Sequence, residues 1–217
     1  MKYSAIITAG GTSSRYGKTN KLLEKIYNKE VIKYTVDEFV KSHMDEIVIC
    51  ANSSIMNTLS EIFSDYKNVK IIQGGNSRQA SVYNGLKVIN CDYVLIHDGA
   101  RPMITSSIIN SVKKAVIEKK AISLMTKTVD TIKEVDENGK IIKTIDRTKL
   151  YNTQTPQAFD YNLIMSAHIK LADKNFTDDA GMIEFLGGDV YIVEGNYENI
   201  KITTKSDLAL AEIYLKK

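Results

Sequence analysis

Short apolar runs alternate with longer amphipathic stretches over the first 126 residues, and this alternation limits the fold more than any other feature. The runs are rich in Ile and Val and apolar on both faces, as is typical of buried parallel strands. Stretches such as 53–66 carry apolar residues at helical spacing. We therefore predict a doubly wound, mainly parallel α/β sheet with right-handed crossovers and helices on both faces. The predicted strands cover residues 3–9, 46–51, 69–73, 93–97 and 121–126.

Residues 128–149 interrupt this alternation. Two β-rich halves flank "ENGK" at 137–140, which is the turn signal of a hairpin. Because an isolated two-stranded hairpin is marginal in water, we expect it to project as an arm and pack against another surface, such as a second subunit. Beyond it, the pattern predicts further helices and strands, including one strand at 199–203. The simplest organisation is a single domain over 1–217 with the arm at about 128–149.

Composition excludes several classes of protein. Of the 217 residues, 43% are hydrophobic and 25% charged, with a formal net charge of +3, so a sizeable core is available without metals or disulfides. The basic residues are scattered, which favours a small anionic ligand over nucleic acid. Two cysteines, Cys50 and Cys91, fit a reduced compartment. No apolar run approaches the roughly 20 residues of a membrane span. We expect a cytoplasmic protein with no nucleic-acid or membrane partner.

The loop after the first predicted strand reads "AGGTSSRYGKTNK". Its Gly17–Thr19 segment imitates the end of a P-loop, but five residues separate Gly17 from Gly11 where the P-loop requires four. The dinucleotide fingerprint G-x-G-x-x-G is absent as well. A glycine pair lets the backbone approach a ligand closely, and Arg15 and Lys21 add charge that suits a triphosphate. An ordinary βα turn with a solvated basic rim explains this loop equally well.

Two more loops follow predicted strands. Asp98 falls at the carboxyl edge of the sheet, where open α/β sheets bind ligands, and it could hold Mg²⁺ or simply pair with Arg101 in a turn. The glycine-rich residues 74–76, with Ser81 nearby, could read a base edge. Two glycine-rich loops at one sheet edge suggest a nucleotide, with its phosphates on one loop and its base near the other.

Further candidates lie in the last third of the chain. Arg147 and Lys201 are cations in β-type segments, although surface charge is the usual explanation for a single lysine. Thr155–Pro156 predicts a turn. No Ser-His-Asp or Cys-His arrangement is readable, so a covalent intermediate is not indicated.

Taken in order, several segments resemble the cytidylyltransferase family of the Rossmann-like nucleotidyltransferase fold. The closest likeness is to members that act on 2-C-methyl-D-erythritol 4-phosphate in the non-mevalonate isoprenoid pathway, and it covers nearly the whole chain. It implies a homodimer linked by arm hairpins, and a reaction that joins CTP to a polyol phosphate and releases pyrophosphate with Mg²⁺ or another divalent cation. The matching segments are "AGGTSSR", "GGNSRQASVYNGL", "HDGARP", "QTPQAF", "TDDA" and "NIKITTKSDLALAE".

The resemblance also implies roles for individual residues. Arg15 and Lys21 would stabilise the triphosphate, and Arg147 and Lys201 would orient the acceptor. Thr131 and Arg147 lie on or beside the arm, so we expect the partner subunit to supply them. The residues matched to cytidine are Ala9, Gly10, Gly11, Gly74, Gly75, Asn76 and Ser81. The residues matched to the acceptor phosphate are Asp98, Arg101, Thr131, Arg147, Thr155, Thr177 and Lys201.

Other functions remain open from the sequence. Ribitol 5-phosphate cytidylyltransferases share "AGG…R", "RP", "QTPQ" and "NIKIT", whereas "GARP", "SVYNGL", "TDDA" and "DLALAE" favour the methylerythritol enzymes. A non-catalytic nucleotide sensor on the same fold and a P-loop NTPase are the alternatives from other classes. The chain departs from the family at Ser13, usually glycine, at Asn20, usually proline, and at Tyr151, usually tryptophan.

Overall fold

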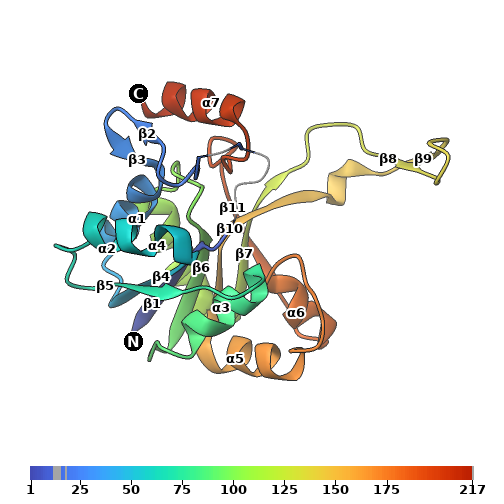
Figure 1. The fold of residues 1–217 in the computed structure, drawn as a ribbon. Helices are drawn as coiled ribbons and strands as arrows, with labels where there is room; N and C mark the ends of the chain where they lie inside the picture. Colours follow the sequence, from blue (N-terminus) through green and yellow to red (C-terminus); the bar gives the residue numbers. More distant parts are fainter. Residues whose placement is uncertain (12–15, 18, 217) are drawn as a thin grey trace.

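A seven-stranded sheet forms the centre of the computed structural model, which describes residues 1–11, 16–17 and 19–216. The strand order is β11-β7-β10-β6-β1-β4-β5 (Figure 1). β10 runs antiparallel to both of its neighbours, and the other pairings are parallel. The predicted doubly wound, mainly parallel fold is therefore confirmed. The strands are β1 (Tyr3–Ala9), β4 (Glu46–Ala51), β5 (Val69–Gln73), β6 (Tyr93–Asp98), β7 (Ala121–Lys127), β10 (Tyr151–Asp160) and β11 (Tyr191–Glu194).

Helices cover both faces of this sheet. Side chains alternate between the faces along each strand, so Ile7 of β1 points into one core and Ile6 into the other. Among the described residues, no helix is long and apolar enough to cross a membrane. One face carries α1 (Val31–Lys41), α2 (Met56–Ile62) and α4 (Ser106–Lys119), and the other carries α3 (Arg78–Leu86), α5 (Tyr161–Lys170) and α6 (Ala180–Phe185).

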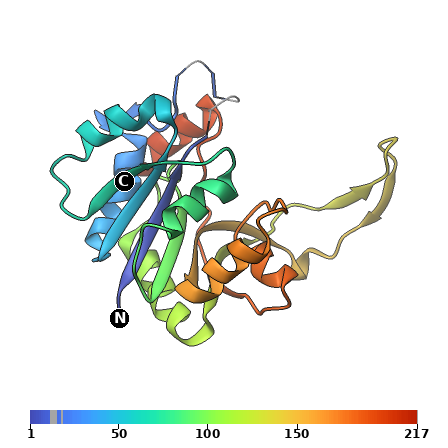
Figure 2. The same cartoon turned by 60° about the horizontal axis from the view of Figure 1, so that its bottom comes forward.

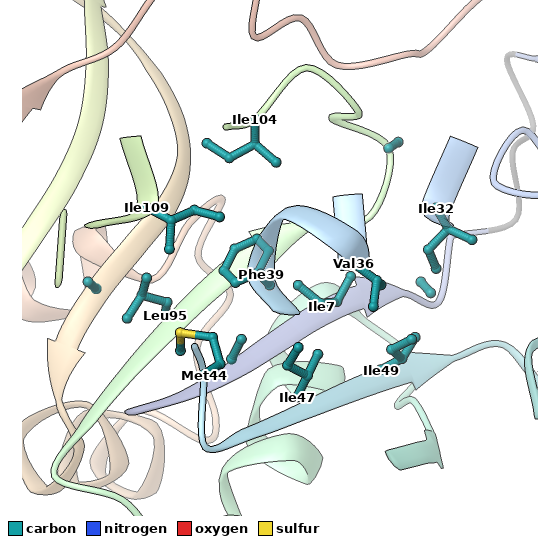
Figure 3. Close-up of a cluster of buried hydrophobic side chains, with 14 of the residues drawn as sticks. Ile7, Ile32, Val36, Phe39, Met44, Ile47, Ile49, Leu95, Ile104 and Ile109 are labelled. Atoms are coloured by element: carbon teal, nitrogen blue, oxygen red, sulfur yellow. The ribbon is translucent and has the colours of Figure 1, made fainter. Parts of the chain in front are cut away.

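The core on the α1 face is shown in Figure 3. Val36 and Phe39 of α1 lie over Ile7 and Leu95 of the sheet, and all four side chains are fully buried. Val36 and Phe39 fall on one side of α1 because their spacing matches the helical period. The helix that carries them is thereby fixed over the carboxyl half of β1.

The C-terminal segment corrects one prediction. Residues 199–203 are not a strand: the Ile202 amide donates to the Ala100 carbonyl at 2.8 Å, and the Ile202 carbonyl accepts from Lys21 Nζ at 2.6 Å. These bonds go to loops, so the segment has no ladder partner. It leads into α7 (Lys205–Leu215), which begins at a capping box between Thr204 and Asp207. Ile202 packs with α7 and with the small hairpin of β2 (Lys25–Ile26) and β3 (Lys29–Glu30).

The arm, residues 128–149, contains a hairpin of β8 (Lys133–Val135) and β9 (Ile141–Thr144), followed by the short helix η2 (Arg147–Lys149). Figures 1 and 2 both show it extending away from the sheet. The single-domain organisation stays a prediction. The large apolar side chains that the arm exposes are Val129, Ile132, Val135, Ile141 and Ile142.

Strand β10 also differs from the prediction. Thr155–Pro156, expected to form a turn, lies inside the strand, and its peptide bond is cis. The pairing with β7 is irregular between Thr153 and Gln157. Proline has no amide hydrogen to donate, so it is accommodated where the ladder is already interrupted.

The tight packing of α3 against the sheet gives a stability prediction. A Cβ at Gly85 would lie 2.9 Å from Ile6 and 3.0 Å from the Cys50 sulfur. Gly85→Ala should therefore lower the free energy of unfolding by about 1–3 kcal/mol, because the buried side chains must shift. Urea denaturation measures this, with Asn110→Ala on the exposed side of α4 as a control that should change it by less than about 0.5 kcal/mol. Equal stabilities would contradict the packing described here.

Candidate active site

A cavity of about 410 Å³ opens at the carboxyl ends of β1 and β6. The chain adds β4 and β5 on one side of β1 and then β6 on the other, so this cavity lies at the topological switch point, where open α/β sheets bind ligands. Its lining residues are Thr8, Ala9, Gly10, Gly11, Lys21, Leu22, Gly75, Asn76, Ser77, Arg78, Ser81, Asp98, Gly99, Ala100, Lys201 and Thr203.

The two glycine-rich loops meet at Ser81, and we call this part of the cavity the nucleotide side. The Ser81 hydroxyl accepts from the Gly75 amide at 3.0 Å and donates to the Ser77 carbonyl at 2.8 Å. A Cβ would lie 3.1 Å from Ser81 Oγ at Gly10 and 2.9 Å at Gly74, so glycine permits this approach. The predicted cytidine residues are thus brought together, with Gly74 directly behind those that line the cavity.

Asp98 anchors the opposite part of the cavity, which we call the acceptor side. Its side chain is 8% exposed, and its Oδ2 lies 2.9 Å from Lys201 Nζ and 3.5 Å from Arg101 Nε. Its Oδ1 lies 3.7 Å from Arg78 Nε and accepts from the Thr8 hydroxyl at 3.3 Å. Three cations, of which Arg78 and Lys201 come from other parts of the chain, therefore converge on one carboxylate.

This arrangement decides the charge of Asp98. Burial opposes its ionisation, but the attraction of Lys201, Arg78 and Arg101 outweighs burial and holds the pKa of the Asp98 carboxyl well below its usual range. Asp179, which lies 2.7 Å from Arg78 Nη1, follows the same rule: burial opposes ionisation, yet Arg78 lowers the pKa of this carboxyl. Both acids are anionic at neutral pH and keep the guanidinium between them.

A short hydrogen-bond chain through Thr155 and His97 holds the backbone of Asp98. The Asp98 amide donates to Thr155 Oγ1 at 3.1 Å, and Thr155 Oγ1 lies 3.0 Å from His97 Nδ1. His97 Nε2 lies 3.5 Å from the Arg101 carbonyl, which can only accept, so Nε2 carries the ring proton and the Thr155 hydroxyl donates to Nδ1 of a neutral imidazole. Burial lowers the pKa of His97 to about 3, which keeps that ring neutral. The Thr155 hydroxyl, predicted to bind the acceptor, is thus occupied by internal hydrogen bonds.

The remaining predicted residues lie in different places. Lys21 lines the cavity and donates to the Ile202 carbonyl. Thr177 is exposed just before the buried Asp179 and does not line the cavity. Thr131 and Arg147 are exposed on the arm, and Arg147 donates to the Val129 carbonyl. Arg15 lies outside the described residues.

Sequence reasoning missed several residues that build this site. Arg78 is not among the residues predicted from the sequence, although it links Asp98 to Asp179. Gln154 and Gln157, buried in β10, were quoted within "QTPQAF" without a role. The sequence carries no clear signal for these two residues, because only the fold shows that their amides are buried and need hydrogen-bond partners.

Asp98 was also predicted to bind a metal ion. Among the described residues, no group of three or more His, Cys, Asp or Glu side chains could hold one. Asp98 is the acid that lines the cavity, and three cations already neutralise it. One compensated carboxylate suits a divalent ion that enters bound to substrate phosphates, and does not suit a resident metal centre.

A doubly wound sheet with two glycine-rich loops and clustered cations at its switch point defines a nucleotidyltransferase of the Rossmann-like class. Sequence comparison is more specific: the profile of the 2-C-methyl-D-erythritol 4-phosphate cytidylyltransferase family matches residues 3–217. The chain belongs to this family. The resemblance noted from the motifs and the predicted enzyme class, cytidylyltransferase, are both confirmed.

Individual relatives agree with this assignment. A 2-C-methyl-D-erythritol 4-phosphate cytidylyltransferase of Clostridioides difficile is 44% identical over 97% of this chain and 92% of its own. Another, from Caldanaerobacter subterraneus, is 41% identical over the full length of both chains. The structure of 4-diphosphocytidyl-2C-methyl-D-erythritol synthase from Anaerococcus prevotii matches with a TM-score of 0.90 at 32% identity, covering 100% of this chain and 96% of its own.

The neutral, buried His97 predicts how stability depends on pH. The unfolded chain binds a proton on this histidine below about pH 6.5, whereas the folded chain does so only near pH 3, so the free energy of unfolding should fall as the pH drops through this window. His97→Asn should reduce that slope by up to about 1.4 kcal/mol per pH unit. Urea denaturation at several pH values measures it.

The matched control is His43→Asn. His43 is exposed, and its positive φ of 54° suits asparagine. This variant should keep the wild-type slope. If His97→Asn also keeps it, His97 is not the group that titrates on unfolding.

Proposed function

We propose that this cavity transfers CMP from CTP to 2-C-methyl-D-erythritol 4-phosphate, giving 4-diphosphocytidyl-2-C-methyl-D-erythritol and pyrophosphate. The proposal rests mainly on one observation: two glycine-rich loops meet in one cavity with Arg78 and Lys201, two of the cations that contact Asp98. The nucleotide side offers backbone groups and Lys21 for CTP. The acceptor side offers Lys201 and Arg78 for a phosphate, while Arg101 contacts the same Asp98 carboxylate from outside the cavity lining.

The chemistry needs little acid–base help. The acceptor phosphate is already an anion at neutral pH, so the enzyme must mainly bring two anions together. One of its oxygens attacks the α-phosphorus of CTP in line, the new P–O bond forms, and the bond to the bridging oxygen breaks as pyrophosphate leaves with the electron pair. Lys21, together with Arg15 by family resemblance, stabilises the charge that develops on the phosphate oxygens.

The acceptor side is suited to orient the second anion. Lys201 is 39% exposed while its ammonium group contacts Asp98, so it is accessible to a phosphate and fixed by a carboxylate. Arg101 and Arg78 stand behind it on the same carboxylate. Asp98, the carboxylate among the described residues that line the cavity, would contact Mg²⁺ or another divalent cation that arrives with CTP, and such a cation would neutralise part of the triphosphate charge.

The deciding experiment offers the protein CTP and Mg²⁺ with either 2-C-methyl-D-erythritol 4-phosphate or ribitol 5-phosphate. We expect rapid pyrophosphate release with the first acceptor and little with the second. This expectation follows from the relatives described above, whose names refer to methylerythritol compounds and not to ribitol 5-phosphate. Release only with ribitol 5-phosphate would overturn the proposed acceptor. CTP binding without pyrophosphate release would indicate a sensor, and release of inorganic phosphate in a parallel assay with ATP would indicate an NTPase.

Charge removal at the triphosphate gives a second test. Lys21→Ala and Arg15→Ala should both fold, although Lys21→Ala loses its bond to the Ile202 carbonyl, and each should lose on the order of 10²- to 10³-fold in kcat because it removes a cation that acts on the transition state. Lys18→Ala is the matched control within the same loop. A P-loop enzyme would need Lys18, whereas the present proposal expects it to be dispensable.

We also propose that the arm joins two chains into a homodimer. It extends from the body (Figure 2) and exposes five large apolar side chains. The predicted acceptor ligands Thr131 and Arg147 are on the arm and do not line the cavity of their own chain. A second chain that packs on the arm would cover the apolar surface and receive Arg147 at its acceptor side. The cytoplasmic location and the lack of nucleic-acid or membrane partners stay predictions.

Mixing two inactive variants tests this arrangement. Arg147→Ala and Lys201→Ala should each lose most activity alone. If Arg147 acts across the dimer, a refolded one-to-one mixture contains mixed dimers with one intact site, and should recover about a quarter of wild-type activity. The unmixed variants carried through the same refolding are the controls. A mixture that stays inactive while forming dimers would show that Arg147 does not act in the other subunit.

A further inference from the structure

Gln157 of β10 uses its whole side-chain amide inside the protein. It is fully buried, and its Nε2 donates to Asp178 Oδ2 at 2.6 Å and to Ser123 Oγ at 3.1 Å. Its Oε1 accepts from the amides of Asp179 at 3.0 Å and Ala180 at 3.1 Å. A glutamine amide has two donor hydrogens and two acceptor lone pairs, so every one is occupied.

These four bonds fix the beginning of α6. Asp179 is the N-cap residue of that helix, yet its own side chain makes no capping bond and contacts Arg78 instead. Gln157 supplies the acceptor that the first amides of α6 need. The Asp179 carboxylate is thereby free to hold Arg78, which in turn reaches Asp98.

Gln154 does the same for the segment before α7. It is 7% exposed; its Nε2 donates to the Asn196 carbonyl at 2.9 Å, and its Oε1 accepts from Asn199 Nδ2 at 3.1 Å. The Asn199 carbonyl accepts from Arg101 Nη1 at 2.7 Å, and Lys201 follows two residues later. Both of these cations contact Asp98.

We propose that Gln154 and Gln157 are positioning residues for the acceptor side of the cavity. Neither lines the cavity, so neither touches substrate. Gln157 fixes the loop whose Asp179 directs Arg78, and Gln154 fixes the loop that carries Lys201 and whose Asn199 carbonyl holds Arg101. This inference rests on the proposed function, since it assigns these residues to binding of the acceptor phosphate and not of CTP.

Changing each glutamine to glutamate tests the proposal with little change in size. Gln157→Glu removes both donor hydrogens and places a negative charge beside Asp178, and Gln154→Glu places one beside the Asn196 carbonyl. Each should raise KM for 2-C-methyl-D-erythritol 4-phosphate on the order of tenfold or more, while KM for CTP stays within about twofold. Asn110→Asp, an exposed amide-to-acid change on α4, should alter neither.

A second change should rescue the first. In Gln157→Glu combined with Asp178→Asn, the amide introduced at 178 can donate to the carboxylate at 157, so the hydrogen bond re-forms in the opposite direction without the charge repulsion. Acceptor KM should return most of the way to the wild-type value. If Gln157→Glu does not fold, this double variant and Gln154→Glu carry the test.

The outcomes separate the two proposals. A wild-type protein that releases no pyrophosphate with the methylerythritol acceptor contradicts the proposed function. An active wild type whose glutamate variants change KM for both substrates alike, or for neither, contradicts only the positioning roles. A thermal unfolding temperature that falls without any split between the two KM values would show that the glutamines only stabilise the fold.

Discussion

Asp98 is buried at the end of β6, and its carboxylate is held by Arg78 from α3, Arg101 from the following loop and Lys201 from the segment before α7. Burying a charge is costly unless partners compensate for it, and an unpaired partner is costly in turn. These four residues therefore depend on one another. Segments that are far apart in the chain have to meet at this carboxylate for the native fold to be stable, so the same contacts maintain the fold and shape the cavity.

The chemistry of the cavity follows from the excess of positive charge around this point. Lys21 adds a further cation on the nucleotide side, while Asp98 is the acid among the described lining residues. Such a cavity attracts anions and stabilises charge on phosphate oxygens, which is what a reaction between CTP and a phosphate requires. Glycine at positions 10 and 74 lets the two loops pack closely against Ser81 at the edge of this cavity. The site consequently needs no nucleophilic side chain.

The sequence predicts the parallel strands well because short Ile- and Val-rich runs that are apolar on both faces are typical of buried strands. It fails at β10, where polar residues and Pro156 hide a strand, and at 199–203, where Ile200 and Ile202 alternate like a strand while the backbone bonds to loops. It places Asp98 and Lys201 individually, but their pairing is a tertiary contact over about a hundred residues. The sequence does not identify Gln154 and Gln157 as supporting residues for the same reason, since only the fold shows what a buried amide contacts.

The ionisation of Asp98 tests the central claim most directly. A ¹³C NMR titration of its carboxyl carbon, assigned with Asp98→Asn, reports the protonation of this one group in the folded protein. If three cations are organised around it, the carboxyl should still be ionised at about pH 3.9, where an unperturbed aspartate is half protonated. A midpoint at or above that pH in the folded state would contradict the account.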